Sequence, residues 1–173
     1  MNKDIKWIIE VTVLAFIITV LFSIGSQILL EDVHVIIGII IIVVFIVIGV
    51  LFDIIGVAVQ SSDATAFHAM ASKKIRSAGT AKKMLENSAK VSSFCNDVIG
   101  DICNIISGSA GVVVAGAIST KFNFNLMITT LLVTSFIAAL TIGGKALGKG
   151  IAVSKSEYIV SKATKFIHLF KKK

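Results

Sequence analysis

The chain has 173 residues, of which 55% are hydrophobic and 16% are charged, and its formal net charge is +7. A soluble domain has roughly 45–50% apolar and about 25% charged residues, so this composition excludes an ordinary soluble enzyme, a disordered chain and a secreted disulfide scaffold. The sequence contains no proline, which also argues against a loop-rich β protein.

Four long apolar segments follow one another along the chain. A membrane-spanning helix needs about 20 apolar residues, and these segments are long enough. Asp53 interrupts the second segment, and Gly143 and Gly144 end the fourth. The sequence therefore predicts an all-α integral membrane protein with four transmembrane helices, at residues 6–30, 35–59, 91–118 and 126–142.

The central loop and the tail have the pattern of amphipathic helices that lie in a membrane interface. Between residues 60 and 90 the composition changes to Ser, Ala, Lys, Asn and Asp, and two short helices are predicted, one from Ala64 and one that follows Gly79. The tail from Ile151 has apolar residues at helical spacing with lysines off that face, which predicts binding to an anionic leaflet. The lysines predicted to contact the membrane surface are Lys155, Lys162, Lys165, Lys171, Lys172 and Lys173.

The basic residues predict the orientation of the chain in the membrane. All Lys and Arg residues except Lys121 lie before the first apolar core, in the central loop or in the tail. The positive-inside rule assigns these regions to the cytoplasm, so both termini are predicted to be cytoplasmic, and the short loops favour a bacterial plasma membrane. The same placement favours a lipid bilayer, and not nucleic acid, as the partner of the basic residues.

The third segment collects its polar residues on one side. At roughly 100° per residue, the polar and glycine positions fill an arc of about 120°, while Val98, Ile102 and Ile106 fall on the opposite side. We expect the apolar side to face lipid and the polar side to turn inward. The polar side comprises Ser93, Asp97, Gly100, Asp101, Asn104, Ser107, Gly108 and Gly111.

These polar residues include two carboxylates one helical turn apart, Asp97 and Asp101. A charged residue near the bilayer centre costs at least about 2.5–3.5 kcal/mol, so the pair indicates a function. Asp53 adds a third carboxylate on the preceding span, and Asp63 lies at the membrane edge. Mg²⁺ is commonly bound by one or two carboxylates with retained water. The sequence therefore predicts a divalent cation site with oxygen ligands from Ser93, Asp97, Asp101 and Asn104.

A structural interpretation of the same residues stands beside the ion site. Polar side chains in membrane helices often only hydrogen-bond to neighbouring helices. Asp97 and Asp101 are also placed to pair with lysines of the central loop, namely Lys82, Lys83 and Lys90. The sequence has no Walker loop, GxSxG, HExxH or Cys/His cluster, and we do not expect an enzyme.

Three short motifs follow one another in an order that resembles a known family. Residues 61–67 read Ser-Ser-Asp-Ala-Thr-Ala-Phe, where the family has S-x-x-E-T-A-L. Residues 95–105 stand in place of I-G-N-N-x-x-N-I, and residues 143–152 are similar to G-E-I-L-P-K-x-L-A. This order resembles the transmembrane domain of the CorB/CorC/cyclin-M (CNNM) magnesium and cobalt transport family. Gly144 and Gly148 replace the glutamate and proline of the family's third motif.

The resemblance implies that the chain binds and transports Mg²⁺, or Co²⁺, as a homodimer without an organic cofactor. Serine, asparagine and acidic positions of the first two motifs form the family's cation site. Carried over to this sequence, they imply a role for Ser62, Asp63, Asn96, Asp97, Gly100, Asp101 and Asn104.

The resemblance also predicts how the chain is divided. Residues 1–33 form an extra N-terminal helix with a short acidic loop, residues 34–156 the CorB/CorC-like domain, and residues 157–173 the basic tail. We expect the chain to lack the family's cytoplasmic CBS pair. The rival prediction is a membrane scaffold or regulatory subunit that transports nothing and binds another membrane protein.

Overall fold

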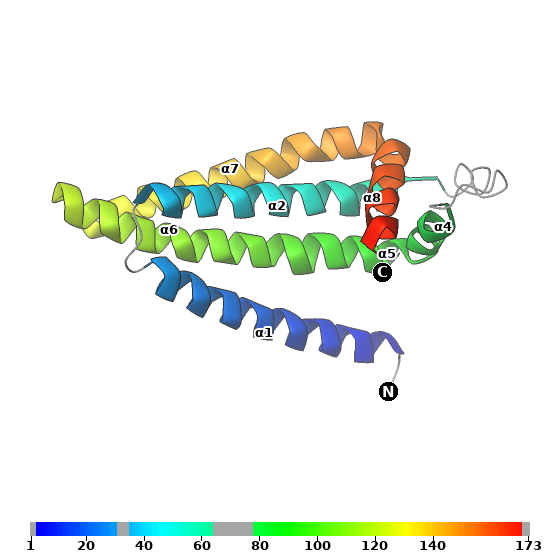
Figure 1. Cartoon of the computed structure of the whole chain (residues 1–173), viewed down its shortest axis with the longest axis horizontal. Coiled ribbons are helices and arrows are strands. Elements are labelled where there is room, and N and C mark those ends of the chain that lie inside the picture. The colour runs from blue at the N-terminus through cyan, green and yellow to red at the C-terminus, as the bar shows by residue number, and fades with distance from the viewer. Residues whose placement is uncertain (1–2, 31–34, 64–77, 171–173) are drawn as a thin grey trace. The chain divides into compact units, whose positions relative to one another are not determined.

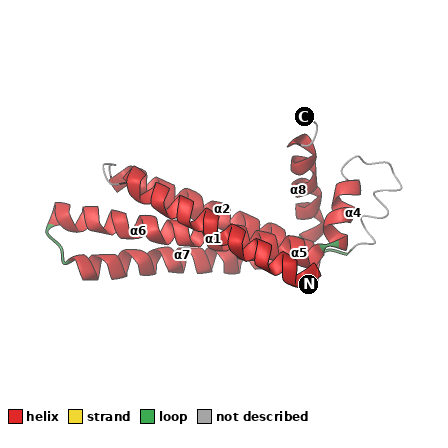
Figure 2. Cartoon of the chain, turned by 90° about the horizontal axis from the view of Figure 1, so that it is seen from below, coloured by secondary structure: helices red, strands yellow, loops and turns green. Residues whose placement is uncertain are grey.

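The computed structural model describes residues 3–30, 35–63 and 78–170, and the regular structure in these residues is helical (Figure 2). Within these ranges, four helical stretches are long and apolar enough to cross a membrane, which confirms the predicted fold class. The first, Ile5–Gly25, lies within α1 (Lys3–Leu30), and the second and fourth are α2 (Val35–Ser61) and α7 (Leu126–Ser154). The third joins three consecutive elements, α5 (Ser88–Ser93), η1 (Phe94–Gly100) and α6 (Asp101–Phe122).

The chain divides into two compact units, which are described separately below. Unit 1 comprises Met1–Gly49 and Val98–Gly144, and therefore holds α1, α6 and the first parts of α2 and α7. Unit 2 comprises Val50–Asp97 and Lys145–Lys173. It holds the last parts of α2 and α7 together with α5, most of η1, α4 (Ala78–Glu86) and α8 (Ser156–Phe170).

In unit 1, α6 is packed on two sides. Val98, Ile102 and Ile106 are buried against α1, which lies alongside α6 (Figure 1). On another side of α6, Ala110 and Val114 belong to a second buried cluster that also contains side chains of α2 and α7. Because α1 covers Val98, Ile102 and Ile106, the prediction that this side of the helix faces lipid is wrong.

The third span is not α-helical throughout, although the sequence predicted one continuous α-helix. Residues Phe94–Gly100 form a π-helical segment, η1. A π-helical turn holds more residues than an α-helical turn, so it shifts the direction of the side chains that follow relative to those that precede it. Such segments are frequent at functional sites, and this one contains Asn96 and Asp97.

The fourth span is longer than predicted, because α7 continues through Gly143 and Gly144 to Ser154. Each glycine in a helix costs about 1 kcal/mol relative to alanine. A backbone that leaves the helix inside a bilayer, however, leaves polar groups without partners. Farther along α7, Gly148 allows close packing, since a Cβ there would meet the side chain of Ile54 on α2. The assumption that glycines end the helix is therefore wrong here.

The turn between α6 and α7 has capping residues at both helix ends. Asn123 follows α6 in the left-handed conformation, with φ 54°. The hydroxyl of Ser119 donates a hydrogen bond to the carbonyl oxygen of Phe124. Asn125 precedes α7 and accepts a hydrogen bond from the backbone N–H of Ile128 through its side-chain oxygen, at 3.3 Å. Asparagine suits both positions, because it tolerates positive φ and caps helix N-termini.

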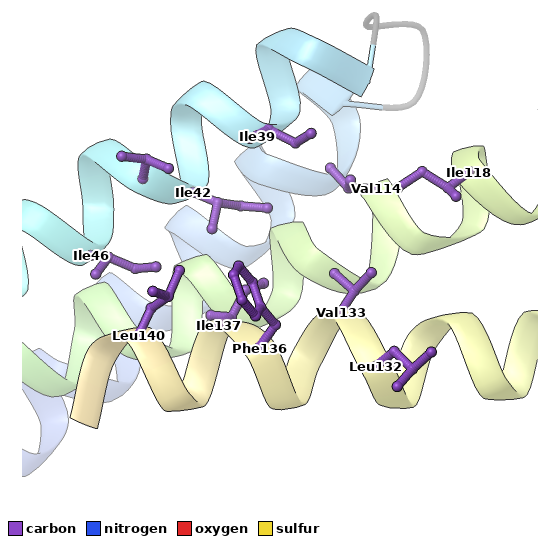
Figure 3. Close-up of a pocket in the computed structure, with 11 residues that line it drawn as sticks. Ile39, Ile42, Ile46, Val114, Ile118, Leu132, Val133, Phe136, Ile137 and Leu140 are labelled. Carbon is purple, nitrogen blue, oxygen red and sulfur yellow. The ribbon is translucent and has the colours of Figure 1, made fainter. Parts of the chain in front are cut away.

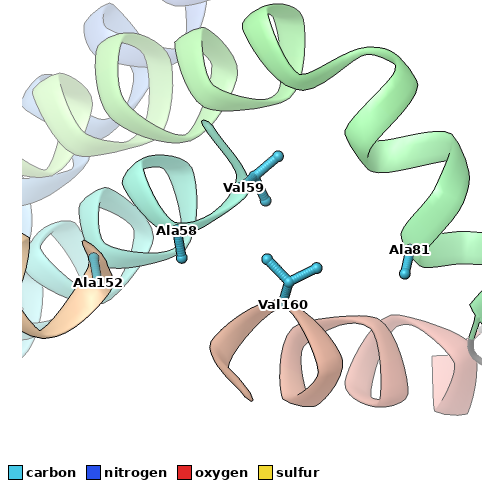
Figure 4. Packing of buried hydrophobic residues seen from close by; sticks show 5 residues of the cluster. All are labelled: Ala58, Val59, Ala81, Ala152 and Val160. Carbon is cyan, nitrogen blue, oxygen red and sulfur yellow. The ribbon is translucent and has the colours of Figure 1, made fainter. Parts of the chain in front are cut away.

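Unit 2 has its own apolar core, formed by Ala58, Val59, Ala81, Ala152 and Val160 (Figure 4). These residues come from α2, α4, α7 and α8, so both short helices place buried side chains against the ends of two long ones.

This core changes the interpretation of the predicted interfacial helices. α4 confirms the second predicted helix of the central loop, although it begins at Ala78 and includes Gly79, and its residues Ala81, Met84 and Leu85 pack within the unit. α8 confirms the predicted tail helix, and it buries Val160 while Tyr158 and Phe166 stay exposed. The helix predicted from Ala64 lies outside the described residues.

Candidate functional site

Asp53 is a buried carboxylate on an otherwise apolar helix. It lies in unit 2 on α2 and is only 4% exposed. Its Oδ1 atom lies 4.0 Å from Nζ of Lys145 on α7, whose side chain is 19% exposed. Among the residues that the structure describes, the other carboxylate oxygen, Oδ2, is buried without a hydrogen-bond partner. The lysine therefore compensates the charge of Asp53 but leaves one oxygen unused.

Asn96 in η1 brings an amide oxygen to the same helix. Its Oδ1 atom lies directly against Gly56 of α2, where the Cβ of any larger residue would overlap it. The Asn96 amide nitrogen donates to the hydroxyl of Ser92 at 3.4 Å, and that hydroxyl donates to Oε1 of Gln60 at 3.5 Å. These long hydrogen bonds orient the amide so that Oδ1 points at α2.

The buried oxygens of Asp53 and Asn96 belong to one small region of unit 2. Asp53 and Gly56 are three residues apart on α2, and residues at this spacing are neighbours on a helix surface, roughly 5–6 Å apart at Cβ. Because Asn96 Oδ1 contacts Gly56, it lies about one helical turn from Asp53. Within the described part of the chain, Oδ1 of Asn96 also has no hydrogen-bond partner. We name Asp53, Asn96 and Lys145 the inner polar site.

Helix lengths place this site near one border of the membrane. At about 1.5 Å per residue, Asp53 lies roughly 27 Å along α2 from Val35, and Lys145 lies roughly 28 Å along α7 from Leu126. The hydrocarbon core of a bilayer is about 30 Å thick. Both charges therefore lie close to the end of the apolar region, where the ammonium group of a lysine can reach the interface.

The two carboxylates of the third span do not turn into the chain. Asp97 and Asp101 are both exposed, on a strip of the helix that also exposes Phe94 and Ile105. Asp97 accepts a 2.6 Å hydrogen bond from the hydroxyl of Ser93, one turn earlier. The prediction that these carboxylates face inward is wrong for the single chain, because α1 covers the apolar side of the helix instead.

Other members of the predicted polar side are buried as expected. Gly100, Ser107 and Gly111 are buried, and Asn104 is half-buried. Gly111 lies against the side chain of Ile137 on α7, so its lack of a Cβ permits close packing. Gly111 thus serves helix packing in unit 1.

The remaining predicted ligands lie at the end of α2. Ser62 is half-buried, and its hydroxyl donates to the carbonyl oxygen of Ala58 at 2.7 Å. Asp63 is exposed. Two of the predicted ligands, Asp53 and Asn96, each bury a side-chain oxygen in unit 2, while the others lie outside this region or have local partners.

The predicted surface lysines are accessible where the structure describes them. Lys155, Lys162 and Lys165 are exposed at the end of unit 2. Nζ of Lys162 lies 5.5 Å from the ring centre of Tyr158, also on α8, within cation–π range. The remaining predicted surface lysines, Lys171, Lys172 and Lys173, lie outside the described residues.

The donor set of the inner polar site restricts the ions that it suits. No group of three or more His, Cys, Asp or Glu side chains gathers in the described residues as a metal site. A zinc-type site needs several such ligands. Mg²⁺ needs only one or two carboxylates, because it keeps several of its water molecules. One carboxylate and one amide oxygen at the inner polar site match this second chemistry.

Unit 1 contains an open groove of different character, with a volume of about 450 Å³. It lies between α2, α6 and α7, and all its lining side chains are aliphatic or aromatic (Figure 3). Ile42 and Phe136 are examples from two of these helices. Such a lining offers no ligand to an ion.

Sequence reasoning missed Lys145, Ser92 and Gln60 as members of this region. Lys145 was expected only to end the fourth span and to set the orientation in the membrane. A usable signal was present, since Asp53 and Lys145 stand at nearly equal distances from the starts of the second and fourth spans. The second and fourth spans start at the same side of the membrane. Residues at equal distances from the starts of these two spans therefore lie at the same depth.

Comparisons with protein-family models, with curated proteins and with solved structures find no match to this chain.

Proposed function

We propose that the chain is an integral membrane protein that binds a divalent cation, Mg²⁺ or Co²⁺, at the inner polar site and transports it across the membrane. The observation that carries the proposal is a pair of buried oxygens, Oδ2 of Asp53 and Oδ1 of Asn96, that have no hydrogen-bond partner among the described residues. Buried polar atoms are almost always hydrogen-bonded, so such exceptions point to a ligand or an ordered water. A hydrated cation satisfies both oxygens at once.

The cation would enter between α2 and η1 with most of its water molecules. Asp53 supplies the negative charge and Asn96 a neutral oxygen, while Ser92 and Gln60 hold the amide in place through their hydrogen bonds. The resemblance to the CorB/CorC family supports the same ion class. It also supports a homodimer, in which the second copy would cover the exposed carboxylates Asp97 and Asp101.

A flux assay tests the transport proposal. The full chain is reconstituted into liposomes that contain a Mg²⁺-sensitive dye, and Mg²⁺ is added outside. We expect Asp53→Asn to lower the initial flux at least about tenfold, because a carboxylate is the only charged ligand of the site. The matched control is Glu86→Gln, which removes an exposed acid that pairs with Lys82 outside the long helices. Equal flux in wild type and Asp53→Asn contradicts the proposal.

A second candidate function is a membrane scaffold or regulatory subunit without transport. Two observations favour it: Lys145 already compensates Asp53, and Asp97 lies exposed on a candidate span where a partner helix would cover it. In this case liposomes show no flux above the protein-free background, and cross-linking in the native membrane captures a different membrane protein in stoichiometric amount.

A further inference from the structure

The ion pair of the inner polar site is loose. A direct hydrogen bond between a charged donor and a carboxylate measures about 2.7–2.9 Å, whereas Nζ of Lys145 lies 4.0 Å from Oδ1 of Asp53. The carboxylate is more deeply buried than the lysine, with 6% and 19% of the side chains exposed. The ammonium group is thus near enough to compensate the charge of Asp53, but it does not make a direct hydrogen bond to the carboxylate.

The two partners differ in their freedom to leave the site. Asp53 has a short side chain on a continuous helix and stays between the helices of unit 2. Lys145 has a flexible stem of four carbons, and a lysine at this depth reaches the membrane interface by extending that stem. Removing a compensating charge from a buried carboxylate is strongly unfavourable, so Lys145 can withdraw only when another cation replaces it.

We infer that Lys145 is a tethered counter-ion that competes with the transported cation for Asp53. The ammonium group compensates Asp53 while the site holds no cation, and it withdraws toward the interface when a divalent cation binds. This exchange keeps the carboxylate compensated in both states and weakens cation binding enough for release. The inference rests on the proposed function, because it assigns a residue that sets the cation affinity of the same site.

Mg²⁺ affinity in matched variants tests the competition. The full chain in lipid nanodiscs is titrated with Mg²⁺ alone, and Lys145→Gln is compared with Lys149→Gln, which removes an exposed lysine one turn later on α7. At low dielectric, two unit charges about 4 Å apart interact strongly. Removing the positive charge of Lys145 should therefore raise the affinity of Asp53 for a cation. We therefore expect Lys145→Gln to bind Mg²⁺ at least about tenfold more tightly, and Lys149→Gln to stay within about twofold of wild type.

Lys145→Arg tests the same idea in the opposite direction and keeps the charge that the fold requires. A guanidinium group pairs with a carboxylate through two parallel hydrogen bonds, so it should compete better and weaken Mg²⁺ binding several-fold. Equal Mg²⁺ affinity in wild type, Lys145→Gln and Lys145→Arg overturns the inference while the proposed function stands.

Thermal unfolding gives a readout that does not depend on transport. In EDTA, Lys145→Gln should unfold at a temperature several degrees below wild type, and Mg²⁺ should restore most of the difference because ligand binding stabilises the folded state. The double variant Asp53→Asn/Lys145→Gln should not respond to Mg²⁺. Absence of Mg²⁺ binding in wild type and all variants contradicts the proposed function and the inference together. Binding by Lys145→Gln alone supports the competition and contradicts transport by the wild type.

Discussion

Gly56 is the residue that allows Asn96 to place its amide oxygen against α2. A Cβ at this position would overlap Asn96 Oδ1 and would lie 3.1 Å from Cβ of Cys95. The amide can rotate away, but the Cβ of Cys95 moves only with its backbone. A single methyl group therefore displaces the amide from the inner polar site and pushes η1 away from α2.

We predict that Gly56→Ala lowers the free energy of unfolding by about 1–3 kcal/mol, the usual cost of overpacking, and weakens Mg²⁺ binding. Gly150→Ala is the matched control, because nothing lies within 4 Å of a Cβ at that position of α7. The control should be neutral or stabilising by about 0.5–1 kcal/mol, since alanine favours a helix. Chemical denaturation in detergent micelles measures both, and equal effects of the two substitutions would refute this assignment.

At the scale of elements, α6 and η1 decide which polar residues face the protein. α1 covers Val98, Ile102 and Ile106, and the exposed strip carries Asp97 and Asp101 instead. In lipid, packing and polar contacts drive helix association more than apolarity does. An apolar helix side is therefore as suitable for a neighbouring helix as for lipid.

We predict the corresponding pattern of thiol reactivity in single-cysteine variants. In micelles that hold the chain as a monomer, cysteine at positions 97, 101 and 105 should react with N-ethylmaleimide faster than cysteine at positions 98, 102 and 106. In the background for these variants, alanine replaces the two native cysteines, Cys95 and Cys103, which are both buried. Faster reaction at 102 and 106 than at 101 and 105 would show that the helix faces the other way.

The sequence predicted the helices of this fold better than their orientations. The four spans, α4 and α8 could be predicted because the length and periodicity of apolar segments are visible in the local sequence. A helical wheel contains no information on three further features: the cover of α1 over Ile102, the π-helical segment, and the continuation of α7 past Gly144.

The candidate site was predicted only in part, because contacts between helices are not visible in a local sequence pattern. Asp53 was predictable as a costly charge in a span, and Asn96 through the family resemblance. The partner of Asp53, Lys145, lies on a different helix of unit 2, and no local pattern connects residues so far apart in sequence.

At the scale of the whole molecule, the distribution of lysines predicts one orientation in the membrane. Asn123 stands between α6 and α7, whereas Lys165 lies on α8 in the basic tail. The positive-inside rule places the tail in the cytoplasm and the turn at Asn123 outside.

We predict that a membrane-impermeant thiol reagent labels Asn123→Cys in intact cells and labels Lys165→Cys only after permeabilisation. Both positions are exposed in the structure, so the side of the membrane on which each one lies determines whether it is labelled. Labelling of both variants from the same side would contradict a four-span arrangement with cytoplasmic termini.

The central claim is that Asp53 and Asn96, rather than the exposed carboxylates, bind the cation. Isothermal titration of the chain in nanodiscs with Mg²⁺ tests this claim most directly, in wild type, Asp53→Asn and Asp97→Asn. Loss of an outer-shell partner alone costs about 10–100-fold in metal affinity, so we predict that loss of the ligand Asp53 costs at least about 100-fold. Asp97→Asn should change the affinity less than about threefold. Unchanged binding in Asp53→Asn, or a loss confined to Asp97→Asn, would contradict the account.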